Sequence, residues 1–220
     1  MEICLEFLPR GEGGQGDQGK MSSLLQQLNT EMAEVVERAG RSLVQVRNGG
    51  RGAGAGTIWH PDGLIITNAH VVGRFPLRVT LPDGRNLAAR LLVHDAARDL
   101  AALAIDATGL PAIDLGESRK LQPGQWVMAM GHPWGVIGAV TSGVVIGLGS
   151  ASPEMPRSGR EWIAVSLHLR PGYSGGPLLD VQGRLVGINT MMTGPEVGMA
   201  VPVHVVKAFL RETLGSKIAA

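Results

Sequence analysis

Gly172-Tyr173-Ser174-Gly175-Gly176-Pro177-Leu178 sets a serine among glycines, and two segments that carry a histidine and an aspartate precede it in the chain. These segments are Thr67-Asn68-Ala69-His70 and Asp99-Leu100-Ala101. A serine hydroxyl is a poor nucleophile at neutral pH, so it needs a neighbouring base, and that base needs an acceptor that fixes its tautomer. The sequence therefore predicts a catalytic triad of His70, Asp99 and Ser174.

The glycines around the serine predict a second feature of the same loop. A residue without a side chain lets the backbone bend tightly. The amides of Gly172 and Ser174, on either side of Tyr173, can then converge on one oxyanion. Gly172, Tyr173 and Ser174 are therefore the candidate oxyanion hole.

The composition describes a globular chain with an aliphatic core and little net charge. Of 220 residues, 44% are hydrophobic but only 4% are aromatic. The chain has 20 basic and 19 acidic residues and a net charge of +1, which gives no electrostatic attraction for nucleic acid or an anionic membrane. No run reaches the roughly 18 apolar residues that a membrane span needs. We expect neither a nucleic-acid partner nor a membrane span.

The N-terminal residues give the only signals that bear on the compartment. Residues 1–10 lack the basic region and the long apolar region of a secretory signal. The single cysteine, Cys4, has no partner for an internal disulfide or a zinc motif. These residues predict a cytoplasmic protein; the alternative is the periplasm or cell envelope, with the targeting segment missing.

Two helices are expected to flank the main domain. Residues 11–20 are polar and glycine-rich, so residues 1–21 are interpreted as a disordered extension. They contain a GxGxxG pattern, but no strand leads into it, which argues against dinucleotide binding. Residues 22–39 have helical spacing and end at Gly40, and residues 203–214 have the same periodicity. A single domain is expected over residues 22–220.

Between these helices the pattern is one of short β runs separated by turn signals such as Pro61-Asp62-Gly63 and Pro82-Asp83-Gly84. The runs form two sets of six, which predicts an all-β fold of two six-stranded antiparallel β-barrels at about 41–106 and 124–202. His70 and Asp99 fall in the first barrel and Ser174 in the second, so the triad would assemble between the barrels. The expected strands are 43–47, 56–59, 64–67, 77–81, 87–94, 100–105, 126–130, 136–148, 162–165, 177–179, 185–189 and 199–201.

Several motifs in one order carry a resemblance to a known family. The chain resembles the HtrA/Deg branch of the trypsin-like serine proteases from about residue 40 to residue 214. The chain ends at Ala220, and we read no PDZ domain, which usually follows in that branch. The motifs are Gly-Ala-Gly-Thr-Ile at 54–58, Leu-Ile-Ile-Thr-Asn-Ala-His-Val-Val at 64–72, Asp99-Leu100-Ala101, Gly-His-Pro-Trp-Gly at 131–135, Thr-Ser-Gly at 141–143, Gly-Tyr-Ser-Gly-Gly-Pro-Leu at 172–178 and Gly-Ile-Asn at 187–189.

The resemblance implies a mechanism and a class of substrate. His70 would be the general base, Asp99 would orient it, and Ser174 would attack the scissile carbonyl. The implied activity is an endopeptidase of protein quality control and stress response that cleaves unfolded or misfolded polypeptides, needs no cofactor or metal, and forms an oligomer, for which the family's common state is a homotrimer.

Substrate specificity in this family depends on loops around the nucleophile and on a strand that pairs with the substrate backbone. Here the loops would be residues 167–171 and 189–198. Six positions before Ser174 stands His168 rather than an acidic residue, which argues against a preference for Lys or Arg before the cleaved bond. We therefore expect cleavage after small or aliphatic residues. The candidate substrate-binding residues are His168, Leu169, Asn189, Met199, Ala200 and Val201.

Two alternatives compete with this interpretation. Gly172-Tyr173-Ser174-Gly175-Gly176 also fits the G-x-S-x-G elbow of α/β-hydrolases, but that fold needs a helix after the serine and the order Ser, acid, His; here Pro177 follows. The second alternative is a chaperone or peptide-binding module that keeps the protease fold but has an inactive or conditionally ordered oxyanion loop.

Overall fold

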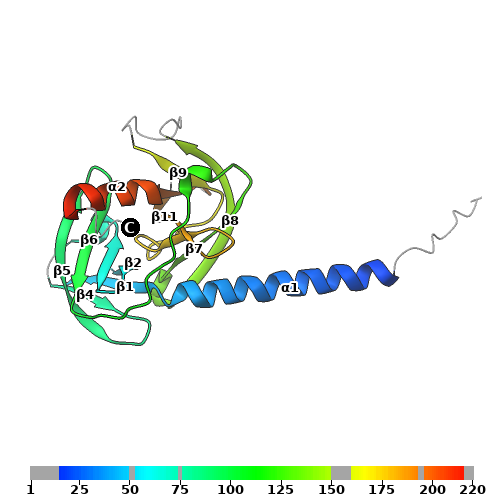
Figure 1. Cartoon of the computed structure of the whole chain (residues 1–220), viewed down its shortest axis with the longest axis horizontal. Helices are drawn as coiled ribbons and strands as arrows, with labels where there is room; N and C mark the ends of the chain where they lie inside the picture. Colours follow the sequence, from blue (N-terminus) through cyan, green and yellow to red (C-terminus); the bar gives the residue numbers. More distant parts are fainter. Residues whose placement is uncertain (1–14, 50–52, 74–75, 150–159, 193–195, 216–220) are drawn as a thin grey trace, which may run out of the picture. The chain divides into compact units, whose positions relative to one another are not determined.

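Two closed antiparallel β-barrels dominate the computed structural model (Figure 1), which describes residues 15–49, 53–73, 76–149, 160–192 and 196–215. In the first barrel the strands run in the order β1-β2-β3-β6-β5-β4, and in the second β10-β11-β12-β9-β8-β7. Closure gives every strand a neighbour on each side. The predicted fold class is confirmed. The strands are β1 Leu43–Asn48, β2 Ala53–His60, β3 Leu64–Thr67, β4 Leu77–Thr80, β5 Asn86–Asp95, β6 Leu100–Ile105, β7 Trp126–Gly131, β8 Ala139–Gly149, β9 Trp162–Val165, β10 Pro177–Leu179, β11 Leu185–Met192 and β12 Gly198–Pro202.

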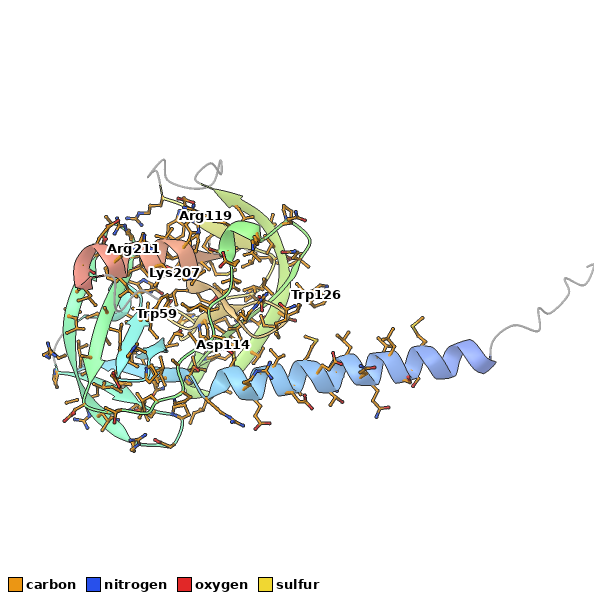
Figure 2. The ribbon with its side chains drawn as sticks, in the orientation of Figure 1. Trp59, Asp114, Arg119, Trp126, Lys207 and Arg211 are labelled. Carbon is orange, nitrogen blue, oxygen red and sulfur yellow. The ribbon has the colours of Figure 1, made fainter. Side chains whose placement is uncertain are left out.

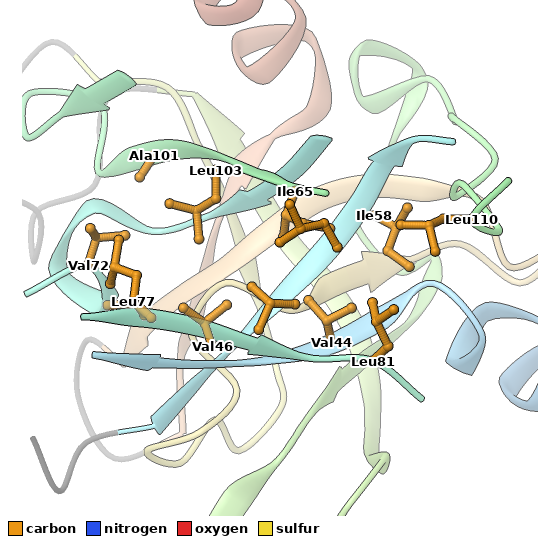
Figure 3. Packing of buried hydrophobic residues seen from close by; sticks show 13 residues of the cluster. Val44, Val46, Ile58, Ile65, Val72, Leu77, Leu81, Ala101, Leu103 and Leu110 are labelled. Carbon is orange, nitrogen blue, oxygen red and sulfur yellow. The ribbon is translucent and has the colours of Figure 1, made fainter. Parts of the chain in front are cut away.

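Aliphatic side chains fill the first barrel, as the composition predicts. Alternate residues of its strands point inward, and Val44 and Val46 of β1 meet Ile58, Ile65 and Leu103 from three other strands (Figure 3). These five side chains are fully buried. The core fixes the register of β3 against β6, and that register decides which residues meet at the ends of the two strands.

The second barrel has a separate core and a more exposed outer surface. Val127, Val145, Ile163 and Leu178 are buried in its interior. Trp126, at the start of β7 (Figure 2), is 56% exposed.

The segment before β8 differs from its prediction. The sequence predicts a strand from Val136, but β8 begins at Ala139. A short 3-10 helix, η3 Pro133–Gly135, comes first, and Gly135 and Gly138 both have positive φ. An extended strand does not accommodate this backbone conformation, so the apolar residues Val136 and Ile137 lie in a loop, where they are exposed.

The N-terminal helix begins earlier than its prediction. α1 spans Gln15–Gly40 rather than residues 22–39, so residues 15–21, expected to be disordered, are helical. Once a helix has nucleated, each added residue costs little, which lets it extend through a glycine-containing segment. The prediction of disorder for residues 1–14 lies outside the described residues. Within the described ranges, no helix is both long and apolar enough to cross a membrane.

The chain divides into two compact units between Glu34 and Val35. The described part of the first unit is helical, and its large apolar side chains Met21, Leu24, Leu25 and Leu28 are 52–62% exposed. The second unit contains both barrels and the C-terminal helix.

The C-terminal helix, α2 Val203–Leu214, has the predicted bounds and contacts both barrels. It packs on β11 and β12 of the second barrel and on β6 of the first. Val206, Phe209 and Leu210 form its buried face, while Lys207 and Arg211 lie on its more exposed side (Figure 2).

Candidate active site

The register of β3 and β6 brings His70 and Asp99 together. Thr67, the last residue of β3, pairs with Ala101 near the start of β6. Residues just after β3 therefore meet residues just before β6. His70 lies in the short helix η1 Ala69–Val71, and Asp99 immediately precedes β6.

Asp99 holds the histidine through several hydrogen bonds. The Nδ1 atom of His70 lies 2.9 Å from each carboxylate oxygen of Asp99. The backbone N–H of His70 also donates to Oδ1 of Asp99, at 3.1 Å. With Nδ1–H directed at the carboxylate, Nε2 of His70 is left to accept a proton.

The Asp99 carboxylate is buried, while the His70 side chain is 47% exposed. Burial raises the pKa of Asp99, but hydrogen bonds from His70 and from the Thr190 hydroxyl outweigh it and hold the pKa below its usual value. Asp99 also has φ of 55°, a left-handed conformation that is uncommon outside glycine. The Nδ2 group of Asn68 donates to the Asp99 carbonyl at 2.9 Å and supports this turn. The carboxylate is therefore fixed in position and ionised.

Ser174 comes from the second barrel and shares a cavity with His70. The cavity has a volume of about 450 Å³. The hydroxyl of Ser174 donates to the Thr190 carbonyl at 2.7 Å, and nucleophilic attack requires that proton to be redirected to Nε2 of His70. Catalytic hydrogen bonds often tighten only when substrate binds. The cavity is lined by Asn48, Ala53, Gly54, His70, Val71, Leu169, Arg170, Pro171, Gly172, Ser174, Thr190 and Met192.

The amides around Ser174 divide into used and unused donors. Tyr173 N–H donates to the Arg170 carbonyl at 3.0 Å, and Gly175 N–H donates to the Asn189 carbonyl at 2.9 Å. Within the described residues, the N–H groups of Gly172 and Ser174 have no such acceptor. The N–H groups of Gly172 and Ser174 are therefore available to bind an oxyanion, while the N–H group of Tyr173 is not.

Close backbone packing explains the glycines of this loop. Gly172 has φ of 108°, and a Cβ atom there would lie 2.6 Å from the His132 carbonyl oxygen. The Gly172 carbonyl in turn accepts the N–H of His132 at 2.9 Å. The loop is thus held against the segment that follows β7.

Hydrogen bonds also tie the nucleophile loop to the first barrel. The N–H of Ala55 donates to the Ser174 carbonyl at 2.8 Å. The hydroxyl of Thr57, also on β2, donates to the Gly175 carbonyl at 3.3 Å.

The structure places only one of the predicted substrate-binding side chains at the cavity. Leu169 lines it. His168 is exposed and does not line it. Asn189 is fully buried, and its Nδ2 group donates to the Pro177 carbonyl at 2.9 Å, which is a structural role.

The predicted substrate-pairing strand is also misplaced. Met199, Ala200 and Val201 belong to β12, which lies between β9 and β11 with both edges paired. All three are buried, and none lines the cavity. Met199 and Ala200 are paired on both sides, so they offer no free edge to a substrate backbone, and the sequence pattern does not reveal which residues are covered in this way.

Sequence reasoning missed several cavity residues. Thr190, Met192 and Arg170 line the cavity, yet no local motif marks them. Thr190 and Met192 fall within the loop at 189–198 that the resemblance indicates, and Arg170 falls within 167–171. The resemblance therefore indicated the segments that contain these residues, but not the individual residues.

His132 is a further buried histidine near the loop. It is 6% exposed, its Nδ1 accepts the N–H of Gly138 at 3.3 Å, and its Nε2 has no hydrogen-bond partner among the described residues. Burial lowers the pKa of His132, and the nearby Val44 carbonyl only partly offsets this. In the described part of the chain, no group of three or more His, Cys, Asp or Glu side chains is arranged to hold a metal ion.

Comparison with protein families and curated proteins gives a consistent result. A family model for the trypsin-like peptidase domain matches residues 54–188. The putative serine protease HhoB of Synechocystis is 38% identical over 159 residues. The probable periplasmic serine endoprotease DegP-like of Halomonas elongata is 40% identical over 164 residues. Mitochondrial serine protease HTRA2 of Drosophila pseudoobscura pseudoobscura is 38% identical over 162 residues.

The matches cover 70–71% of this chain but only 34–38% of those three relatives, so the chain spans little more than a third of their length. Among solved structures, the HtrA-type protease AlgW with a tripeptide has a TM-score of 0.76 and 30% identity, covering 84% of this chain and 64% of that one. The serine endoprotease from Yersinia pestis has a TM-score of 0.74 and 32% identity, covering 83% and 66%.

Proposed function

Because the chain belongs to the trypsin-like peptidases of HtrA type, we propose that it is a serine endopeptidase that cleaves unfolded or misfolded polypeptides. One observation carries the proposal. His70 and Ser174 come from different barrels and line one cavity, while the buried Asp99 holds the imidazole from behind.

The proposed mechanism assigns a role to each group. Nε2 of His70 takes the proton of the Ser174 hydroxyl as its oxygen attacks the substrate carbonyl, and Asp99 stabilises the imidazolium that forms. The N–H groups of Gly172 and Ser174 receive the developing oxyanion, a contribution worth about 100- to 1,000-fold in kcat for a single donor. His70 then gives the proton to the leaving amine.

The cavity wall supports a preference for small or aliphatic residues before the cleaved bond. Leu169, Val71 and Met192 contribute apolar surface to it. Thr190 to Met192, at the end of β11, extend beyond the β10 pairing that stops at Ile188. Their free edge is where we place the substrate backbone, in an extended conformation that adds to the sheet.

The test compares wild type with Ser174→Ala. We expect wild type to degrade casein and to be labelled by a fluorophosphonate, and Ser174→Ala to do neither. His70→Ala is expected to lose labelling as well, because the hydroxyl then lacks its base. The catalytic assignment would be overturned if folded wild type were not labelled by the fluorophosphonate, whether a native or a denatured protein substrate was present.

The oligomeric state and the cellular compartment are proposed by similarity to the related proteins. A homo-oligomer, with the trimer as the expected state, is tested by light scattering on the purified protein; a monomeric mass at working concentration contradicts it. The Halomonas elongata relative is named a probable periplasmic endoprotease, and this supports the cell-envelope alternative for this chain over the cytoplasm. Cell fractionation distinguishes the two.

A further inference from the structure

Among the described residues that line the cavity, Arg170 carries the only permanent charge. None of these residues is acidic, and the remainder, apart from His70, are uncharged. Arg170 also forms no ion pair with a carboxylate in the described ranges. An unneutralised cationic residue that lines the cavity attracts negative charge to the proposed substrate site.

The guanidinium is held by an aromatic ring. Its central carbon lies 4.7 Å from the centroid of the Trp134 ring, a cation–π arrangement. Trp134 itself is 73% exposed and has φ of 53°, an unusual conformation for a bulky residue. A cation–π contact uses none of the guanidinium N–H groups as hydrogen-bond donors to a carboxylate, and those groups match the two oxygens of a carboxylate.

We propose that Arg170 is a specificity-determining residue that selects substrates with an acidic side chain close to the scissile bond. The inference rests on the proposed function and names its substrate class more narrowly. The aliphatic side chain before the cleaved bond lies against Leu169 and Met192, and a Glu or Asp at a flanking position pairs with Arg170.

The side chain of Arg170 is separable from the architecture of the loop. The bond that shapes the loop runs from the N–H of Tyr173 to the backbone carbonyl of Arg170. Any residue at position 170 supplies that carbonyl. Arg170→Gln therefore removes the charge and leaves the loop bond in place.

The experiment uses paired peptides that differ only by Glu or Gln, placed in turn at each of three positions on both sides of an aliphatic cleavage residue. At low salt, wild type is expected to show a kcat/KM about 3- to 10-fold higher for Glu than for Gln at one or more positions, the size typical of an exposed charge-assisted hydrogen bond. The ratio should fall toward 1 at high salt, because exposed charges are screened.

Three variants accompany wild type. Arg170→Gln should bring the Glu/Gln ratio to about 1, and Arg170→Lys should retain part of it. Arg160→Gln is the matched control: Arg160 stacks over Trp162 at 5.9 Å, and neither residue lines the cavity. This control should keep the wild-type ratio.

Two kinetic outcomes overturn the inference. If Arg170→Gln leaves the Glu/Gln ratio of kcat/KM unchanged, including by lowering kcat/KM equally for both peptides, Arg170 does not select acidic residues. A wild type that is labelled by the fluorophosphonate but shows no Glu preference also contradicts the selection by Arg170, while the proposed function stands.

Binding provides a readout that does not need catalysis. Fluorescence anisotropy of the same peptides on Ser174→Ala should show about 3- to 10-fold tighter binding of the Glu peptide, lost in Ser174→Ala/Arg170→Gln. If wild type proves inactive, the proposed function fails, and this arm still decides the inference: equal affinities for the Glu and Gln peptides overturn it.

Discussion

At the scale of single residues, Asp99 depends on a partner that lies far away in the sequence. The Thr190 hydroxyl donates to its Oδ2 atom, and Thr190 also lines the cavity. Thr190→Val removes this donor from a buried carboxylate while nearly preserving the side-chain volume. Because this bond helps to hold the carboxylate that orients His70, we expect kcat to fall by about tenfold, which corresponds to about 1.4 kcal/mol in the activation barrier.

Peptide hydrolysis by Thr190→Val and Thr190→Ser measures this effect. Thr190→Ser keeps the hydroxyl and should retain most of the activity. Equal kcat values for Thr190→Val and wild type would show that Asp99 does not need the bond.

His132 makes stability depend on pH in a defined direction. Burial lowers its pKa below the ordinary 6.5, so the unfolded chain binds the proton more tightly than the folded chain does. The contribution of neutral His132 is therefore fully present above pH 6.5 and is lost as pH falls below it. Asp99, whose pKa is also lowered, acts in a separate window, with its contribution present above 3.8 and lost below.

Urea denaturation at pH 7.5 and pH 5.5 tests this expectation. Wild type should lose free energy of unfolding between these pH values, and His132→Asn, which cannot titrate, should lose less. A wild type and variant with parallel pH dependence would mean that His132 takes up its proton without cost in the folded state.

The site residues that the sequence predicts lie in local motifs, whereas those it misses are placed by contacts between distant parts of the chain. His70, Asp99 and Ser174 each stand in a local motif, and their order limits the fold that can join them. Thr190 and Arg170 have no such local pattern. Their positions at the cavity depend on how β11 and the loop before Ser174 lie in the folded protein, which the neighbouring sequence does not encode visibly.

At the scale of elements, two glycines with nearly the same positive φ differ in how closely other atoms pack around them. Gly175 has φ of +85°, and a Cβ atom there would overlap the Ala55 carbonyl oxygen and the Thr67 hydroxyl. Gly84 has φ of +87° with no atom within 4 Å of such a Cβ. Gly84→Ala should therefore cost only the strain of a left-handed residue, about 1–2 kcal/mol, whereas Gly175→Ala should cost about 3 kcal/mol or more, because the backbone must also shift.

Denaturant unfolding of both variants separates the two costs. Similar losses in free energy of unfolding for the two variants would argue that the loop around Ser174 moves freely away from β2. A larger loss for Gly175→Ala would agree with the close packing of this loop against the first barrel.

Elements are predicted well where hydrophobic periodicity is uninterrupted. β3, β6 and α2 have the bounds that the sequence indicates. The exceptions have identifiable causes: apolar residues at Val136 and Ile137 indicate a strand, but Gly135 and Gly138 impose a loop. The assignment of β12 to substrate binding failed because the extent of pairing with each neighbouring strand decides which residues keep a free edge, and that extent follows from long-range pairing.

At the scale of the whole molecule, α2 joins the barrels to each other and to the site. Phe209 is fully buried, and the helix contacts β6, β11 and β12. Arg98, the neighbour of Asp99, pairs with Glu212 of this helix at 2.6 Å. Phe209→Ala should destabilise the protein by about 3–5 kcal/mol, as for other large core truncations.

The matched control is Arg211→Ala on the exposed side of α2, expected to change the free energy of unfolding by about 0.5 kcal/mol or less. Chemical denaturation measures both. A loss of under about 1 kcal/mol for Phe209→Ala would mean that α2 is dispensable for holding the barrels.

The carbonyl of Ser174 accepts a hydrogen bond from Ala55 in the other barrel, so contact between the barrels holds the loop that carries the proposed nucleophile. The proposed nucleophile and its proposed base come from different barrels, so separation of the barrels would abolish the proposed activity while each sheet is still intact. Under the proposed endopeptidase activity, a molecule that begins to unfold becomes a substrate for its neighbours when its own activity is lost. In a heated population, self-digestion would then slow as unfolding proceeds, because every molecule that becomes cleavable is one that no longer cleaves.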